Sequence, residues 1–154
     1  MRWIVLMLMM VACASGCRNS ATTEEASRDE TDLDLLQGVW VAEAYERDGQ
    51  PVGAAVLRIT QIIIEGDALE LIESRQEGEM VTIKLDTSAN PKKIDLRIAK
   101  GSDAGKIAPG IYRLDGDVLR ICWAAPGQER PMAFTTINGK AVASLTLSRL
   151  RESD

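Results

Sequence analysis

The sequence predicts an all-β fold, a small antiparallel barrel of eight or nine short strands. Apolar and polar residues alternate with a period of two in runs such as "VTIKLD" and "IDLRIA", which is typical of strands with one face in water. Turn-forming pairs, among them Asn90-Pro91, Asp115-Gly116 and Asn138-Gly139, separate the runs at regular intervals. Short strands spaced in this way are typical of an antiparallel barrel or sandwich.

The strands can be assigned in order along the chain. The segment "VGAAVL" after Pro51 interrupts them with a single helical turn, and no pattern of strands alternating with helices is visible. The expected strands are Val39–Arg47, Leu57–Ile64, Leu69–Ser74, Val81–Asp86, Ile94–Ala99, the two arms of a hairpin within Gly110–Ala124, Met132–Thr136 and Ala141–Leu150.

The hairpin "GIYRLDGDVLRICWA" predicts which side chains face inward. A two-residue type I′ turn at Asp115-Gly116 would set Tyr112 opposite Leu119. Cys122 would then lie on the wetter face, together with two arginines, Arg113 and Arg120. The inner, apolar face would carry Tyr112, Leu114, Leu119, Ile121 and Trp123.

Trp40 and Arg149 are predicted to form a structural pair that closes the barrel. Trp40, Ala42 and Ala44 fall on one side of the first strand, and Arg149 ends the apolar face of the last strand. A guanidinium can lie on an indole face with a gain of about 0.5–2 kcal/mol. The two residues would meet only if the sheet closes on itself.

An export signal precedes the domain. Arg2 is followed by an apolar run from Trp3 to Cys13, and then by small residues. A transmembrane anchor is the alternative, but the run is shorter than the roughly 18–20 residues that a spanning helix needs. Small residues directly before Cys17 resemble the bacterial lipoprotein signal, in which the cysteine is lipidated. Cys13 is the other candidate, but it would leave a leader of only residues 1–12.

The chain therefore divides into a signal peptide at 1–16, a lipidated Cys17 with an acidic flexible tether at 17–34, and a barrel domain at 35–154. Residues 18–34 contain many acids and almost nothing apolar, so they cannot bury enough surface to fold. Acyl chains on Cys17 would anchor the protein in a lipid bilayer. The expected location is the cell envelope, on the periplasmic or extracytoplasmic side. In the mature chain Cys122 is the remaining cysteine and a candidate free thiol.

"LQGVW" at the start of the domain resembles the glycine-x-tryptophan motif of lipocalins, and Arg149 stands where lipocalins carry the arginine that covers the tryptophan. Together with "ERDGQPV", "KKIDL", "GIYRLDGDVLRIC" and "PGQERP", the motif resembles an uncharacterised lipocalin-like domain family common in planctomycete bacteria. The resemblance runs from Leu35 to about Leu150. It implies an often exported barrel, and it brings no established activity, cofactor or catalytic residue.

Several classes of function are disfavoured by composition. The chain has no histidine, and its formal net charge is −5, so imidazole catalysis, the usual zinc sites and nucleic-acid binding are not expected. "GSDAGKI" departs from a phosphate-binding loop in spacing, and the turn explains the neighbouring Asp115 and Asp117. We expect no catalytic residues, no metal and no cofactor, and we expect that the protein is not an enzyme.

Two functions remain. The first is a binding module for a small apolar ligand or lipid, with Ala42 and Ala44 leaving room inside the barrel. The alternative is a structural or protein-interaction module of the cell envelope with a solid core and no ligand, which the aromatic content of 4% favours. A cavity in the structure discriminates between the two.

Overall fold

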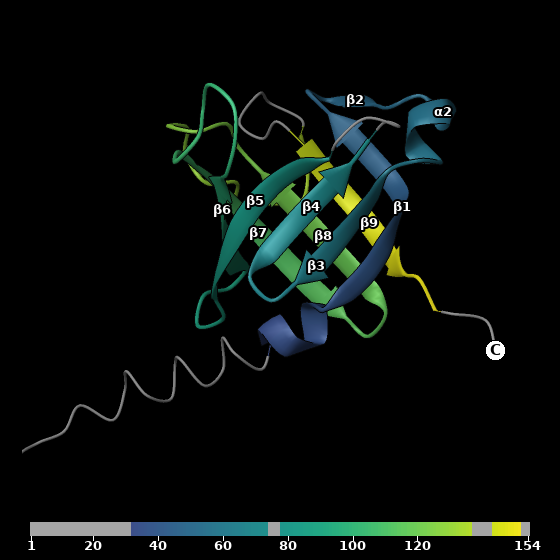
Figure 1. Ribbon diagram of the computed structural model, residues 1–154, viewed down its shortest axis with the longest axis horizontal. Coiled ribbons are helices and arrows are strands. Elements are labelled where there is room, and N and C mark those ends of the chain that lie inside the picture. The colour runs from purple at the N-terminus through teal and green to yellow at the C-terminus, as the bar shows by residue number, and fades with distance from the viewer. Residues whose placement is uncertain (1–31, 74–77, 137–142, 152–154) are drawn as a thin grey trace, which may run out of the picture.

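The computed structural model describes residues 32–73, 78–136 and 143–151. These residues form a closed, eight-stranded antiparallel barrel with one additional short strand (Figure 1). The strands are β1 (Gly38–Arg47), β2 (Gln50–Pro51), β3 (Gln61–Glu65), β4 (Ala68–Ile72), β5 (Glu79–Asp86), β6 (Lys92–Ile98), β7 (Ile107–Asp115), β8 (Val118–Trp123) and β9 (Ala143–Arg149). The helix α2 covers Ala54–Leu57, and a further short helix spans residues 32–36.

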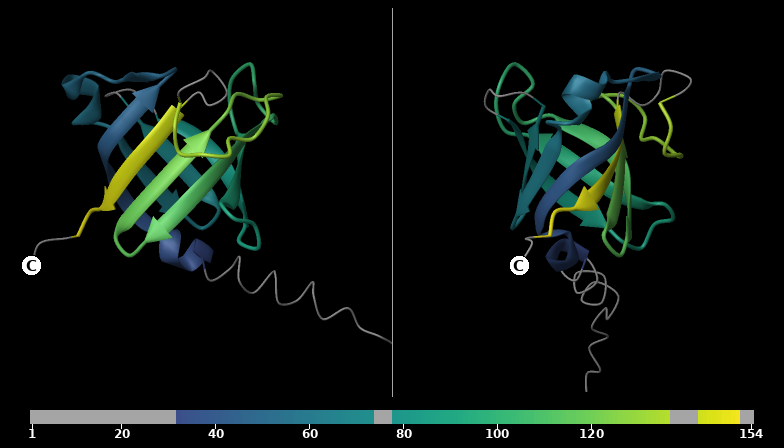
Figure 2. Two further views of the ribbon diagram at one scale, coloured as in Figure 1. Left: turned by 180° about the vertical axis from the view of Figure 1, so that it is seen from behind. Right: turned by 90° about the vertical axis from the view of Figure 1, so that its right-hand side faces the viewer.

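The barrel closes because β1 has a partner on each side. It pairs with β3 along one edge and with β9 along the other, and consecutive strands from β3 to β9 pair in sequence order. Figure 2 shows β9, in yellow, lying between β1 and β8. The predicted antiparallel barrel is confirmed.

One predicted strand begins too early, and another is absent. Leu57 ends the helix α2, so β3 begins only at Gln61. Residues 132–136 form no strand, because β8 pairs directly with β9, with Trp123 opposite Ala143, and leaves no free edge at that point. The predicted turn at Asn138-Gly139 lies outside the described residues.

A β-bulge reverses the facing of side chains in the middle of β1. Ala42 pairs with Leu147 and Ala44 pairs with Thr146, so the strand holds one extra residue between them. Beyond the bulge Tyr45 points inward and is 3% exposed, whereas Ala44 lies in solvent. The prediction that Ala44 leaves room inside the barrel is therefore wrong.

The β7–β8 hairpin has the predicted faces but a different register. Asp115 pairs with Val118, and Tyr112 lies opposite Ile121. The turn is therefore Gly116-Asp117, and the positive φ of 58° lies at Gly116, the position where a type II′ turn requires glycine. Because the register differs by two residues, and side chains alternate with a period of two, every inward side chain still points inward.

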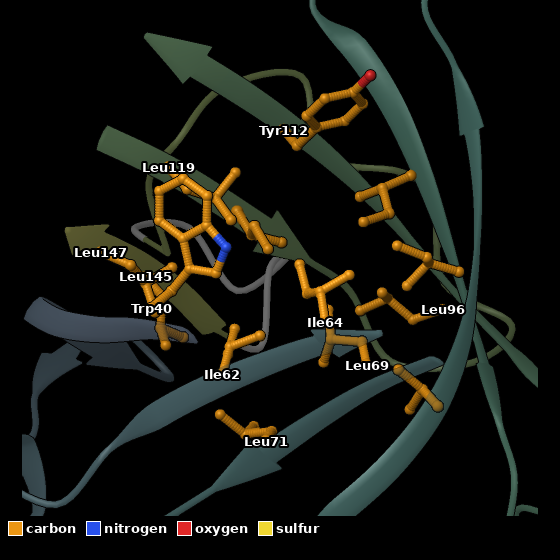
Figure 3. Close-up of a cluster of buried hydrophobic side chains, with 14 of the residues drawn as sticks. Trp40, Ile62, Ile64, Leu69, Leu71, Leu96, Tyr112, Leu119, Leu145 and Leu147 are labelled. Atoms are coloured by element: carbon orange, nitrogen blue, oxygen red, sulfur yellow. The ribbon is translucent and has the colours of Figure 1, made fainter. Parts of the chain in front are cut away.

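The core is solid at the end of the barrel that the helix of residues 32–36 covers. Trp40, fully buried, lies among apolar side chains of β3, β8 and β9 in Figure 3. Leu36 of the covering helix is also fully buried, and Leu33 packs against the same core. The Asp32 carboxylate accepts hydrogen bonds from the Tyr112 hydroxyl and the Lys92 ammonium, each at 2.6 Å. Residues 32–34, assigned to the tether from sequence, therefore belong to the folded domain.

Candidate functional site

A cavity of about 430 Å³ opens at the end of the barrel opposite to the helix of residues 32–36. Figure 1 places β2 and α2 at this open end. The volume falls within the range of about 300–1,000 Å³ that is typical of small-molecule sites. Its walls are mostly aliphatic side chains from seven strands: Ile62, Leu69, Leu71, Val81, Leu96, Ile98, Ala108, Ile121 and Ala143.

Small inward residues make this half of the barrel hollow. Ala108 of β7 and Ala143 of β9 line the cavity and are almost fully buried. Gly110 of β7 is two positions after Ala108, and a Cβ there would stand 2.9 Å from the carbonyl oxygen of Cys122. The space was predicted from sequence at Ala42 and Ala44, which do not line the cavity. The alternation that places Ala108 and Ala143 inside was nevertheless visible in the sequence.

The rim of the cavity is polar. Two oxygens of Glu73 accept hydrogen bonds from the Arg47 guanidinium, at 2.5 and 2.7 Å. The Tyr45 hydroxyl donates to Glu73 and accepts from Arg47. Burial, reinforced by the hydrogen bond to Glu73, raises the pKa of Tyr45 well above its ordinary value. Tyr45 is therefore a neutral hydroxyl that holds the Arg47–Glu73 ion pair in place.

Three further rim residues complete the site. Asp103, in the loop between β6 and β7, forms an ion pair with Lys106 at 2.7 Å. Glu79 lines the cavity at the first position of β5 and forms no ion pair with any other described residue. Trp123 ends β8 on its inner face and is half-buried against the core. Of these three, only Trp123 was placed inside the barrel from sequence.

The structure brings Trp40 and Arg149 together at the closed end, away from the cavity. The two are register partners between β1 and β9, and the guanidinium carbon lies 4.2 Å from the centre of the indole. Arg149 also donates to the carbonyl oxygens of Gln37 and Leu35, each at 2.6 Å. The indole N–H donates to the carbonyl oxygen of Leu36 at 2.9 Å. The pair therefore fastens the segment before β1 across the closed end.

Cys122 is on the outer face of the barrel, as predicted, but it is not on a wet surface. Its exposed fraction is 0%, and it packs with Ile111 and Phe134. The loop 124–136 crosses this face, held by an ion pair of 2.6 Å between Arg130 and Asp95. Burial raises the pKa of the Cys122 thiol, so the group is protonated and shielded.

The remaining site predictions fall elsewhere. Cys17 and Cys13 lie outside the described residues. In the part of the chain that the structure describes, no cluster of three or more histidine, cysteine, aspartate or glutamate side chains could hold a metal ion. Nor does any helix in that part have the length and apolar character needed to cross a membrane.

Comparison with known proteins gives no match to a protein-family model, to a curated protein or to a solved structure. The lipocalin-like family therefore stays a prediction from the motifs.

Proposed function

We propose that the protein is an exported lipoprotein, anchored in the membrane through Cys17, whose lipocalin-like barrel binds a small apolar ligand or lipid and catalyses no reaction. The observation that carries the binding function is the cavity of about 430 Å³ with aliphatic walls and a polar rim. Such a lining removes apolar ligand surface from water, with a gain of about 25 cal/mol per Å². The polar rim keeps the mouth wetted and orients what enters.

The solid half of the core supports this assignment. Large, fully buried side chains such as Trp40, Tyr112 and Leu147 fill the closed end, so the fold does not depend on a ligand to complete its core there. The open half has small residues at positions that a purely structural barrel fills with large ones. None of the described residues fills the open end, as the alternative of a solid-core module of the envelope would require.

Filling the cavity tests the proposal. The probe is N-phenyl-1-naphthylamine, a neutral aromatic compound that fluoresces in apolar surroundings. Ala143→Leu places a larger side chain on the cavity wall, and Ala55→Leu makes the same change on the exposed side of α2. We expect saturable binding to the wild type and to Ala55→Leu, and binding at least about tenfold weaker, or 1.4 kcal/mol, to Ala143→Leu. Equal binding by both variants would place the probe elsewhere and contradict the proposal.

A further inference from the structure

The rim side chains point to the head group of the ligand. In β5 the inward residues are Val81, Ile83 and Leu85, so the alternation also turns Glu79 inward. Leu69 and Leu71 point inward from β4, and Glu73 continues that row. Charged side chains therefore stand at the rim in the same inward rows that form the apolar wall below, where a ligand's polar end would lie.

The rim carries an excess of negative charge among the described residues that line the cavity. The positive charge of Arg47 is matched by Glu73, with which it forms two hydrogen bonds. Asp103 is matched by Lys106. The carboxylate of Glu79 is left without a cationic partner in the described part of the chain. A ligand with a positive head group would supply that partner, whereas a ligand carboxylate would have to displace Glu73 from Arg47.

Trp123 adds a second feature that favours a cation. Its indole lines the same cavity from β8, and β8 stands three strands away from β5 around the barrel. The carboxylate and the aromatic ring therefore approach the mouth from different sides. An indole face attracts an ammonium group by about 0.5–2 kcal/mol, depending on how far the contact is removed from water.

We propose that the cavity binds a cationic amphiphile, whose apolar chain lies against the aliphatic wall and whose ammonium group lies at the rim between Glu79 and Trp123. The inference rests on the proposed binding function and names the chemical class of its ligand. The Arg47–Glu73–Tyr45 cluster stays intact in the complex and limits the width of the mouth.

Three probes of eight carbon atoms each distinguish the contribution of the head group to binding from that of the apolar chain. Octylammonium, octan-1-ol and octanoate are titrated into the purified full-length protein by isothermal calorimetry, at concentrations where none forms micelles. We expect octylammonium to bind most tightly, octan-1-ol more weakly and octanoate most weakly. The preference for octylammonium over octan-1-ol falls as the salt concentration rises, because exposed charges are screened.

Two variants locate the head group, and a third is the control. Glu79→Gln weakens octylammonium binding about two- to fivefold, the range expected for a partly exposed ion pair, and leaves octan-1-ol unchanged. Glu65→Gln removes the same charge from an exposed position at the closed end and changes neither. Trp123→Leu keeps an apolar side chain and lowers the ratio of octylammonium to octan-1-ol affinity.

The results of these titrations test the binding function and the cationic head group separately. Binding of none of the three probes contradicts the binding function itself. Two other results would overturn the cationic head group but not the binding function. One is binding of octan-1-ol or octanoate as tight as that of octylammonium. The other is an equal effect of Glu79→Gln on the binding of octylammonium and of octan-1-ol.

Discussion

A double-mutant cycle measures the interaction energy between Trp40 and Arg149. Trp40→Leu keeps an apolar side chain in a fully buried position. It removes the hydrogen bond to the Leu36 carbonyl, at about 1 kcal/mol, and leaves a residual cavity, at about 1–2 kcal/mol. It also removes the stacked guanidinium contact, which is 4.2 Å in the structure and is expected to stabilise the fold by about 0.5–2 kcal/mol. The free energy of unfolding should fall by about 3–4 kcal/mol in total.

Arg149→Met keeps most of the side-chain length and removes the charge. It leaves the carbonyl oxygens of Gln37 and Leu35 without their donor. Because water reaches this partly exposed site, we expect a loss of about 2–3 kcal/mol, smaller than the loss in Trp40→Leu. Both single variants lose the same stacked contact, so the double variant should be more stable than the sum predicts by about 1 kcal/mol.

Unfolding in guanidinium chloride gives the free energy of unfolding of the wild type, the two single variants and the double variant. It is followed by circular dichroism in the far ultraviolet, which does not depend on tryptophan fluorescence. Arg113→Met, at an exposed arginine of β7, is the control and should combine additively with Trp40→Leu. A coupling energy between Trp40 and Arg149 within about 0.3 kcal/mol of zero would refute the reasoning, because the two side chains would then act independently.

Three further predictions concern single residues. The mature protein should begin at an acylated Cys17 and sediment with membranes, and Cys17→Ser should release it or block its processing; mass spectrometry that finds lipid on Cys13, or an unmodified Cys17, contradicts this. Cys122 should react with thiol reagents far more slowly than an exposed cysteine, because it is buried under the loop 124–136, and Cys122→Ser should cost about 1–2 kcal/mol of stability; rapid labelling of the folded protein would argue against the burial. Tyr45 has a pKa raised by burial, so its neutral form stabilises the fold fully at neutral pH, and the stabilisation is lost as the pH rises above the ordinary tyrosine pKa of about 10. Tyr45→Phe should therefore lose less stability than the wild type between pH 8 and pH 11, and an identical pH dependence of unfolding would count against the coupling.

The fold was predictable because its evidence in the sequence is local. Alternation and turn residues act over a few positions, so the runs around Ile83 and Leu96 were correctly read as strands. The inward face of the β7–β8 hairpin followed from its alternation of apolar and polar residues. The register did not follow, because Asp115-Gly116 and Gly116-Asp117 are both acceptable two-residue turns. Packing of the whole barrel decides between them.

The candidate site was harder to predict. Glu79 continues the inward row of β5, but its height above the core depends on the tilt of the strands, which no local pattern records. Cys122 was expected on a wet face because the loop that covers it comes from residues 124–136, and their packing is held by a contact between Arg130 and Asp95. Long-range contacts of this kind leave no periodic trace in the sequence.

Because of its bulge, β1 tolerates the loss of one residue better than the gain of one. Glu43 is the residue in excess, because Ala42 and Ala44 pair with consecutive positions of β9. Loss of one residue there would restore strict alternation and keep both Trp40 and Tyr45 facing inward. Gain of one residue would either leave two residues in excess opposite β9 or shift the pairing of Tyr45 with β9 by two positions. Between these aromatic residues the chain can therefore shorten by one position during evolution far more readily than it can lengthen.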